Sequence, residues 1–425
     1  MNDLNFSYKN IWFWILFIVF FSSGFVFFKF PFEFYFHYLF LILLTPLFIF
    51  KIGFPNFIFK LFFIPLLVGL IHVALGNNLF FTFFKIIGGL FLVTLFFYYI
   101  IHFYEFDIMT IFIIYCKGTW VLCLIAIFQI VFYFFNFKAG YDFSWFLNKW
   151  GFVEGGILGF RVNSILSEPT YLATVLSPSV YLSIKNLVFK DKFIFNRFQS
   201  IIVIFISIMT TSSVGYVGIL ISFLLVTNTI RLRYFIIGLL ITLITFSLSY
   251  TYVKDVKLRA DAARGLWLDE NFNINNTNNS SFVLYNNLHI AKENLSNYLF
   301  FGTGLGSHET AFKKFTLTKS LIQYDFEFNI KDGNSLFVRL CTETGLIGLG
   351  FILLLLVKGF IYKVDDDNKD LFYHHLISQS IFVLLILVLI RQGNYMLNGL
   401  PLLFLMYFYN YTQYNDKLNK IGEEN

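Results

Sequence analysis

The chain has 425 residues, of which 58% are hydrophobic and only 13% are charged. Soluble globular proteins carry about 25% charged residues, so this composition excludes an ordinary soluble domain. The formal net charge is +6. In a membrane protein, the distribution of Lys and Arg between the loops indicates which side of the membrane each loop occupies. We therefore expect no nucleic-acid partner.

Apolar blocks recur along the whole chain. A run of about 18 or more apolar residues can cross a bilayer as a helix, which satisfies its own backbone hydrogen bonds there. We expect an all-α, polytopic membrane protein, a single domain over residues 1–425, embedded in the lipid bilayer. Its twelve expected transmembrane helices lie near 11–28, 34–50, 57–75, 79–101, 108–135, 164–184, 200–211, 214–229, 234–250, 335–357, 371–390 and 395–411.

Lysine and arginine are unevenly distributed between the two alternating sets of short loops. One set contains fourteen of them: Lys9, Lys51, Lys60, Lys185, Lys190, Lys192, Arg197, Arg231, Arg233, Lys358, Lys363, Lys369, Lys417 and Lys420. The opposite set contains five: Lys29, Lys138, Lys149, Arg161 and Arg391. Because positively charged loops stay in the cytoplasm, both termini are expected there. The large loop 251–334, between the ninth and tenth helices, is then expected on the outer face, with short helices between 281 and 319.

Polar side chains collect at the outer ends of the expected helices. They are Arg161 and Glu168 before the sixth, Ser212 and Ser213 in the turn TTSS (210–213) before the eighth, Asp332, Asn334, Arg339 and Glu343 at the tenth, and Arg391, Gln392 and Asn394 between the last two. Ionisable groups at membrane depth are costly and usually line a cavity. Arginine binds phosphate through two parallel hydrogen bonds. We therefore expect an outward-facing site for an anionic, phosphorylated, lipid-linked substrate.

The stretch before the sixth helix predicts its own local geometry. Pro169 suits the first position of a helix, which places Glu168 at the cap, beside the positive helix end. Arg161 then lies on the preceding segment. The structural alternative is that Arg161 and Glu168 form a pair that ties the loop down.

Structural alternatives also exist for the other charged residues. Arg339 and Glu343 are four residues apart, which suits a simple ion pair on one helix face. Arg391 can extend to the membrane interface. The stretch GTGLG (302–306) has glycine spacing like a nucleotide loop, but no strand and helix surround it, so a turn is expected. No cluster calls for a metal ion or a cofactor.

Five stretches resemble, in family order, those of the bacterial O-antigen and capsule repeat-unit polymerases, which form one superfamily with the O-antigen ligases. They are RVNSILSEPTYLA (161–173), similar to R-x-x-S-x-x-x-E-P-S/T, then TTSSVGYVGIL (210–220), FGTGLGS (301–307), NSLFVRLCTETGLIGLGFILLLL (334–356) and RQGNY (391–395). The similarity spans over half of the chain. Twelve helices and one large late outer loop are also typical of that family.

The resemblance implies a glycosyltransferase that uses no nucleotide sugar. Such enzymes join oligosaccharide repeat units carried on undecaprenyl pyrophosphate, at the periplasmic face of the bacterial inner membrane. The growing O-antigen or capsule chain moves from its lipid carrier onto a new lipid-linked unit, and undecaprenyl pyrophosphate leaves. A separate chain-length regulator is an expected partner.

The leaving pyrophosphate needs charge stabilisation, and the acceptor hydroxyl needs a base or an orienting group. The predicted catalytic residues are Arg161 and Arg391, at the pyrophosphate, and Glu168, either as base or as the holder of an arginine. The residues predicted to bind substrate are Asn334, Arg339, Glu343, Ser212 and Ser213.

Two alternatives stay open. The related O-antigen ligases move finished polymer onto lipid A–core and usually carry a histidine directly before the Asn of the tenth-helix motif. This chain has Gly333 at that position, which favours the polymerase. A transporter, including the flippase of the same pathway, is usually built from repeated halves with a site near the bilayer midplane, and no such halves are visible here.

Overall fold

The computed structural model describes residues 2–29, 32–190, 192–227, 254–268, 279–319, 328–362 and 368–424, with scattered positions between 236 and 251. Within these ranges the regular secondary structure is helical. Two isolated β-bridges, Val26–Tyr35 and Glu154–Phe160, pin the loops before α2 and before α7. The all-α prediction is therefore confirmed.

The helices agree with the expected apolar blocks to within a few residues at most ends. They are α1 (Asn2–Phe21), α2 (His37–Ile52), α3 (Asn56–Ala74), α4 (Phe80–Phe103), α5 (Ile108–Phe134), α6 (Lys138–Tyr141), η1 (Phe143–Trp145), α7 (Pro169–Phe189), α8 (Arg197–Met209), α9 (Ser213–Thr227), α11 (Lys254–Trp267), α12 (Asn279–Asn297), α13 (His308–Phe315), α14 (Leu336–Gly359), α15 (Lys369–Arg391), η4 (Leu397–Gly399) and α16 (Leu400–Glu424). The first ends earlier than expected, at Phe21, and the last begins later, at Leu400.

Six of these helices are long and apolar enough to cross a membrane: α3, α4, α5, α7, α14 and α15. Four shorter apolar helices accompany them, Ile11–Phe21, His37–Ile52, Arg197–Met209 and Ser213–Thr227. The chain thus has the features of a helical membrane protein. The total of twelve transmembrane helices stays a prediction, and the expected ninth, 234–250, lies largely outside the described residues.

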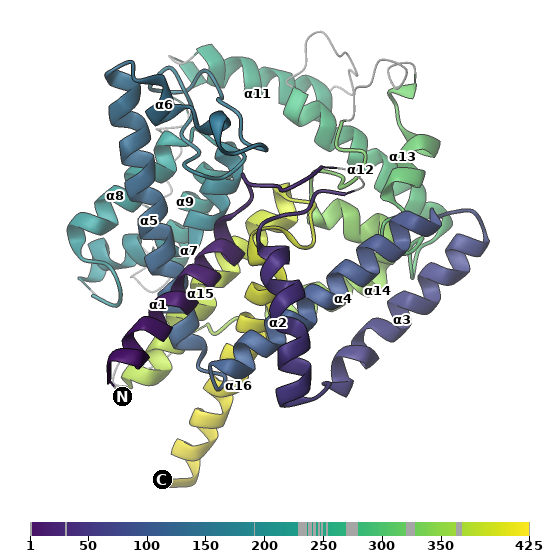
Figure 1. Ribbon diagram of the computed structural model, residues 1–425. Helices are drawn as coiled ribbons and strands as arrows, with labels where there is room; N and C mark the ends of the chain where they lie inside the picture. The colour runs from purple at the N-terminus through teal and green to yellow at the C-terminus, as the bar shows by residue number, and fades with distance from the viewer. Residues whose placement is uncertain are drawn as a thin grey trace.

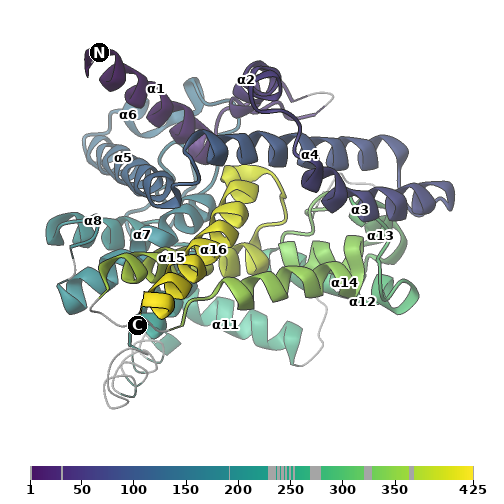
Figure 2. The ribbon, with the colours of Figure 1, turned by 90° about the horizontal axis from the view of Figure 1, so that it is seen from below.

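Two helices are central to the bundle, and both carry predicted site residues at their ends. The candidate spans α7 and α15 are 83% and 78% buried, whereas α3 is only 11% buried. α7 packs against α8, α9 and α15. Figure 1 shows α15 and α16 near the middle of the bundle, α3 at its edge, and both chain ends at the lower end. Figure 2 shows the same arrangement from below.

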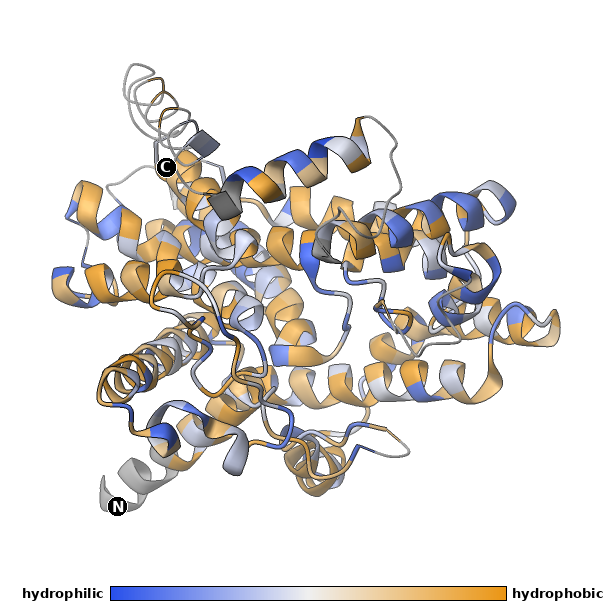
Figure 3. Ribbon diagram, turned by 90° about the horizontal axis from the view of Figure 1, so that it is seen from above, coloured by the Kyte–Doolittle hydropathy of each residue, from blue (hydrophilic) through white to orange (hydrophobic). Residues whose placement is uncertain are grey.

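Within its described residues, the segment 251–334, expected to be a large outer loop, contains α11, α12 and α13, and the last two agree with the short helices expected between 281 and 319. α12 packs along α14. In Figure 3 the bundle is mostly hydrophobic, and hydrophilic turns are prominent in the helices of this loop.

α14 is interrupted at Gly345, where φ is 61° and ψ is −160°. The turn 299–304 supplies the hydrogen bonds that the break removes; for example, the Gly304 N–H donates to the Glu343 carbonyl at 2.8 Å. A Cβ atom at Gly302 would lie 2.6 Å from the carbonyl carbon of Glu343, so only glycine permits this approach. The stretch GTGLG is therefore a turn, as expected, and it stabilises the broken helix.

Candidate functional site

One cavity of about 130 Å³ brings together three segments that are far apart in the sequence. It lies where α7 begins, where α14 begins and where α15 ends. The residues that line it are Glu168, Thr170, Tyr171, Asn329, Asp332, Asn334, Arg391, Gln392 and Gly393. The structure thus places three predicted site residues, Glu168, Asn334 and Arg391, in one cavity.

Glu168 caps α7, as predicted from the proline that follows it. Its backbone is extended, with φ −145° and ψ 151°, and its carbonyl accepts the Tyr171 N–H at 3.1 Å. Its carboxylate makes no capping bond and opens into the cavity. The Glu168 residue is partly exposed to solvent, but the protein atoms around it still displace enough water to raise the pKa of its carboxyl; the charge of Lys149 opposes this rise in pKa, and Asp332 adds to it. Such a carboxyl is suited to exchange a proton with a bound molecule.

The loop before α14 holds Asp332 and Asn334 in a defined geometry. Asp332 Oδ1 accepts hydrogen bonds from the Asn334 backbone N–H and from the Asn329 side-chain amide, both at 3.1 Å. Gly333 and Asn334 have φ of 61° and 59°, a conformation that glycine and asparagine adopt most readily. The tight turn places both residues in the lining of the cavity.

His308 lies directly behind this turn. Its ring nitrogens are 3.2 Å from Thr342 Oγ1 and 3.0 Å from Asn287 Oδ1. Burial lowers the pKa of His308 to about 3, so the ring is neutral. A Cβ atom at Gly333 would lie 3.0 Å from His308 Nε2. The left-handed backbone and the nearby His308 ring together favour glycine at position 333.

Arg391 is the last residue of α15, and the turn that follows it closes the cavity. Gly393 is pressed against the loop before α14, since a Cβ atom there would lie 1.7 Å from the Asp332 carbonyl oxygen. The Arg391 guanidinium interacts electrostatically with Glu168 and Asp332. One arginine and two carboxylates therefore share this cavity.

The N-terminus of α7 adds positive potential to the cavity. α7 begins at Pro169, and Thr170 and Tyr171 of its first turn line the cavity. The N-terminus of a helix acts as roughly half a positive charge. Together with Arg391, this helix end offsets part of the negative charge of Glu168 and Asp332.

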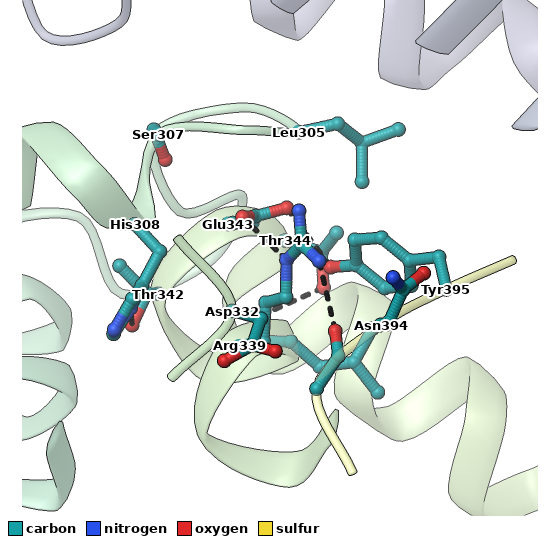
Figure 4. A network of polar contacts seen from close by, with 12 residues as sticks. Leu305, Ser307, His308, Asp332, Arg339, Thr342, Glu343, Thr344, Asn394 and Tyr395 are labelled. Atoms are coloured by element: carbon teal, nitrogen blue, oxygen red, sulfur yellow. Dashed lines mark hydrogen bonds and ion pairs between the residues drawn. The ribbon is translucent and has the colours of Figure 1, made fainter. Parts of the chain in front are cut away.

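Figure 4 shows Arg339 held between Glu343 and the Tyr395 ring. Arg339 Nε lies 2.8 Å from Glu343 Oε1, and the two side chains are only 4% and 0% exposed. A second guanidinium nitrogen donates to the Gly393 carbonyl at 2.8 Å, and the Tyr395 hydroxyl donates to Glu343 Oε2 at 2.9 Å. Neither charged residue lines the cavity. The structure favours the ion-pair alternative over the predicted substrate binding.

The remaining predicted residues lie beside the cavity. Arg161 Nε donates to the Thr210 carbonyl at 3.2 Å, so it ties the segment before α7 to the turn before α9. Ser212 is buried, and its Oγ lies 3.5 Å from Oγ1 of Thr170, a lining residue. Ser213 begins α9 and is exposed. Arg161 thus ties down the segment before α7, as the structural alternative supposed. The bond shown here is to the Thr210 backbone carbonyl, whereas the alternative supposed a pair with Glu168.

Sequence reasoning missed several residues of this region. Thr170 and Tyr171 follow Glu168 within the first turn of α7, and that proximity was an available signal. Asn329 and Lys149 lie in irregular loops, where no periodicity indicates which side chains meet. Only the folded chain shows that they approach the cavity.

The sequence matches no known protein-family model and no curated protein. The likeness to the polymerases is therefore a likeness of motifs, and the function has to be argued from the cavity.

Replacing Gly333 with alanine tests the contact with His308. The left-handed backbone costs a non-glycine residue about 1–2 kcal/mol, and the new Cβ would displace either His308 or the Asp332–Asn334 turn. We expect Gly333→Ala to lower the thermal midpoint of the purified protein while the protein still accumulates in membranes.

Gly350→Ala is the matched control, because a Cβ atom there meets nothing within 4 Å. A thermal midpoint in Gly333→Ala equal to that of Gly350→Ala would contradict the assigned role of this turn.

Proposed function

We propose that this protein polymerises oligosaccharide repeat units carried on undecaprenyl pyrophosphate, at the periplasmic face of a bacterial inner membrane. The product is O-antigen or capsular polysaccharide. Both termini lie in the cytoplasm in this proposal, and the cavity opens to the periplasm.

The reaction moves a glycosyl group between two lipid-linked molecules. The bond between the anomeric carbon and the donor pyrophosphate breaks, and its electron pair leaves with undecaprenyl pyrophosphate. A bond forms between the same carbon and the acceptor hydroxyl, whose proton passes to Glu168. Arg391 and the N-terminus of α7 stabilise the charge that develops on the leaving pyrophosphate. Asp332 and Asn334 orient the acceptor hydroxyl.

The observation that carries this proposal is the cavity itself. It combines a proton-accepting carboxyl, Glu168, with a cation, Arg391, at the ends of the two most buried candidate spans. A transporter site would be expected near the bilayer midplane, and these residues lie at helix ends. Arg161 lies close enough for its charge to act on Glu168.

Deletion of the gene, followed by electrophoresis of the cell-surface polysaccharide, tests the proposal. A polymerase defect leaves single repeat units on their anchor and removes the ladder of longer chains. Undecorated core with polymer accumulating on its lipid carrier would identify a ligase instead. Failure of repeat units to reach the periplasm would identify a flippase.

The rate of polymerisation by purified protein should fall at acidic pH. Glu168 accepts a proton only when ionised, and the removal of water from around it places its pKa above the ordinary value of 4.5. The activity should therefore be lost as the pH falls through this raised pKa, at a higher pH than for an ordinary carboxyl. Steady-state rates across the acidic range, compared with the slow rate of Glu168→Gln, provide the measurement. A wild-type rate that does not decline on the acid side would exclude Glu168 as the base.

A further inference from the structure

A charged cluster beside the cavity is not used by the proposed chemistry. Lys149 Nζ lies 2.5 Å from Glu33 Oε2, donates to the Tyr35 hydroxyl and lies 4.9 Å from the centre of the Tyr35 ring. The Tyr35 hydroxyl donates to the same Glu33 oxygen at 2.6 Å. Burial alone would raise the pKa of Glu33, but hydrogen bonds from Lys149 and Tyr35 lower it. The carboxylate is therefore ionised and holds the ammonium in place.

Stability alone does not account for this arrangement. The Lys149 and Glu33 side chains are 27% and 41% exposed, and ion pairs in such surroundings contribute little to folding. The backbone that carries the lysine is nevertheless fixed. Asn148 and Val26 exchange two hydrogen bonds, and the Lys149 N–H donates to the Gly24 carbonyl at 3.1 Å. A partly exposed lysine whose backbone is held by hydrogen bonds indicates a role for its charge.

The same loop leads from this lysine to the cavity. Gly24 is pressed against the backbone three residues before Glu168, since a Cβ atom at Gly24 would lie 2.3 Å from the Ile165 carbonyl oxygen. On the other side, Tyr35 packs in one apolar cluster with Tyr171. Tyr171 lines the cavity, one turn of α7 after Glu168. Two independent contacts therefore place the charged cluster next to the Glu168 end of the cavity.

Several groups act electrostatically at this end of the cavity. The charges that act on Glu168 are those of Lys149, Asp332, Arg391 and Arg161, and the Tyr171 phenol lies within the same field. Removal of water from around Glu168 raises the pKa of its carboxyl, and the charge of Lys149 opposes that rise.

We propose that Lys149 is a positioning residue of the cavity: its ammonium, held by Glu33 and Tyr35, lies beside the Glu168 end of the cavity and favours the charged form of the Glu168 carboxylate. This inference rests on the proposed function only in one respect, namely that Glu168 accepts the proton of the acceptor hydroxyl. The charge relation between the two residues holds whatever substrate the cavity binds.

Carbodiimide labelling of the full-length protein in detergent measures this relation without any catalytic turnover. The reagent reacts with protonated carboxyls, so mass spectrometry of the Glu168 peptide across a pH series reports its protonation. We expect Lys149→Met to move the labelling midpoint upward by roughly 0.5–1 pH unit, because a nearby opposite charge favours the ionised form. Lys149→Arg should keep the wild-type midpoint.

Lys138→Met is the matched control. Lys138 lies in the same outer segment, but its side chain is 78% exposed and lies 3.9 Å from Asp142, so its removal should leave the midpoint unchanged. An identical midpoint in the wild type and in Lys149→Met overturns the inference. If Glu168 resists the reagent throughout in the wild type, Lys149→Met must make it reactive, and continued resistance overturns the inference too.

The labelling experiment tests the role of Lys149, and the gene deletion tests the proposed function, so each can be refuted without the other. A shifted midpoint in a protein whose gene deletion leaves the polysaccharide ladder intact would refute the polymerase and keep the role of Lys149. An unshifted midpoint, together with a lost ladder in Glu168→Gln, would refute only the role of Lys149.

Discussion

Arg391→Ala is expected to abolish the polysaccharide ladder while the protein still accumulates in membranes. Arg391 is the only arginine that lines the described cavity, and it shares that cavity with Glu168 and Asp332. Removal of one charge-stabilising group from a preorganised site typically lowers the rate about 100- to 1,000-fold. Such a loss would leave single repeat units as the main product. Complementation of a deletion strain with each variant, followed by gel analysis, measures the effect.

Three further variants separate charge from geometry. Arg391→Lys keeps the charge but cannot donate two parallel hydrogen bonds, so partial recovery is expected. Arg161→Ala should also abolish the ladder, because it removes both a charge near Glu168 and the bond to Thr210. Arg197→Ala, at the exposed start of α8, is the matched control and should polymerise normally. A full ladder in Arg391→Ala would remove this residue from the site.

Arg339→Met is expected to destabilise the protein strongly. The variant leaves the fully buried Glu343 carboxylate without its cation, and a broken buried pair typically costs about 3–5 kcal/mol. We expect a marked fall in the thermal midpoint measured by size-exclusion chromatography after heating, and reduced accumulation in membranes. Glu343→Leu should behave in the same way, because it leaves the Arg339 guanidinium buried.

The double variant Arg339→Met/Glu343→Leu distinguishes folding from positioning. Replacement of a buried ion pair by apolar residues is often neutral for stability, so most of the thermal midpoint should return. The Gly393 carbonyl nevertheless loses the guanidinium that holds it, and the turn that follows Arg391 is no longer fixed. We expect a folded protein with a weak ladder. Normal polymer from the double variant would show that the pair serves stability alone.

The helices were largely predictable from the sequence, because apolar blocks of bilayer length are a strong signal. The cap of α7 was also predictable, since Pro169 restricts the backbone locally. The break in α14 at Gly345 was not, because a glycine within an apolar block is compatible with an unbroken helix. The break persists because the turn 299–304, a distant segment, supplies its hydrogen bonds.

The candidate site shows the same division. The sequence alone identified Glu168, Asn334 and Arg391 as polar groups at helix ends. Ionisable groups at membrane depth are costly and usually line a cavity. The sequence identified Arg339 and Glu343 equally strongly, and nothing local distinguishes a cavity residue from a buried pair. The difference appears only when α14 packs beside the turn 391–395.

By itself the sequence determined the helical class of this protein, the apolar blocks that form its helices and the helix ends at which polar groups collect, because these depend on residues close together along the chain. The tertiary structure decided which polar groups meet: Glu168 with Asp332 and Arg391, Arg339 with Glu343 and Gly393, and Lys149 with Glu33. Those meetings depend on how α7, α14 and α15 pack and on which loops cross between them. Packing of this kind is a property of the whole folded chain.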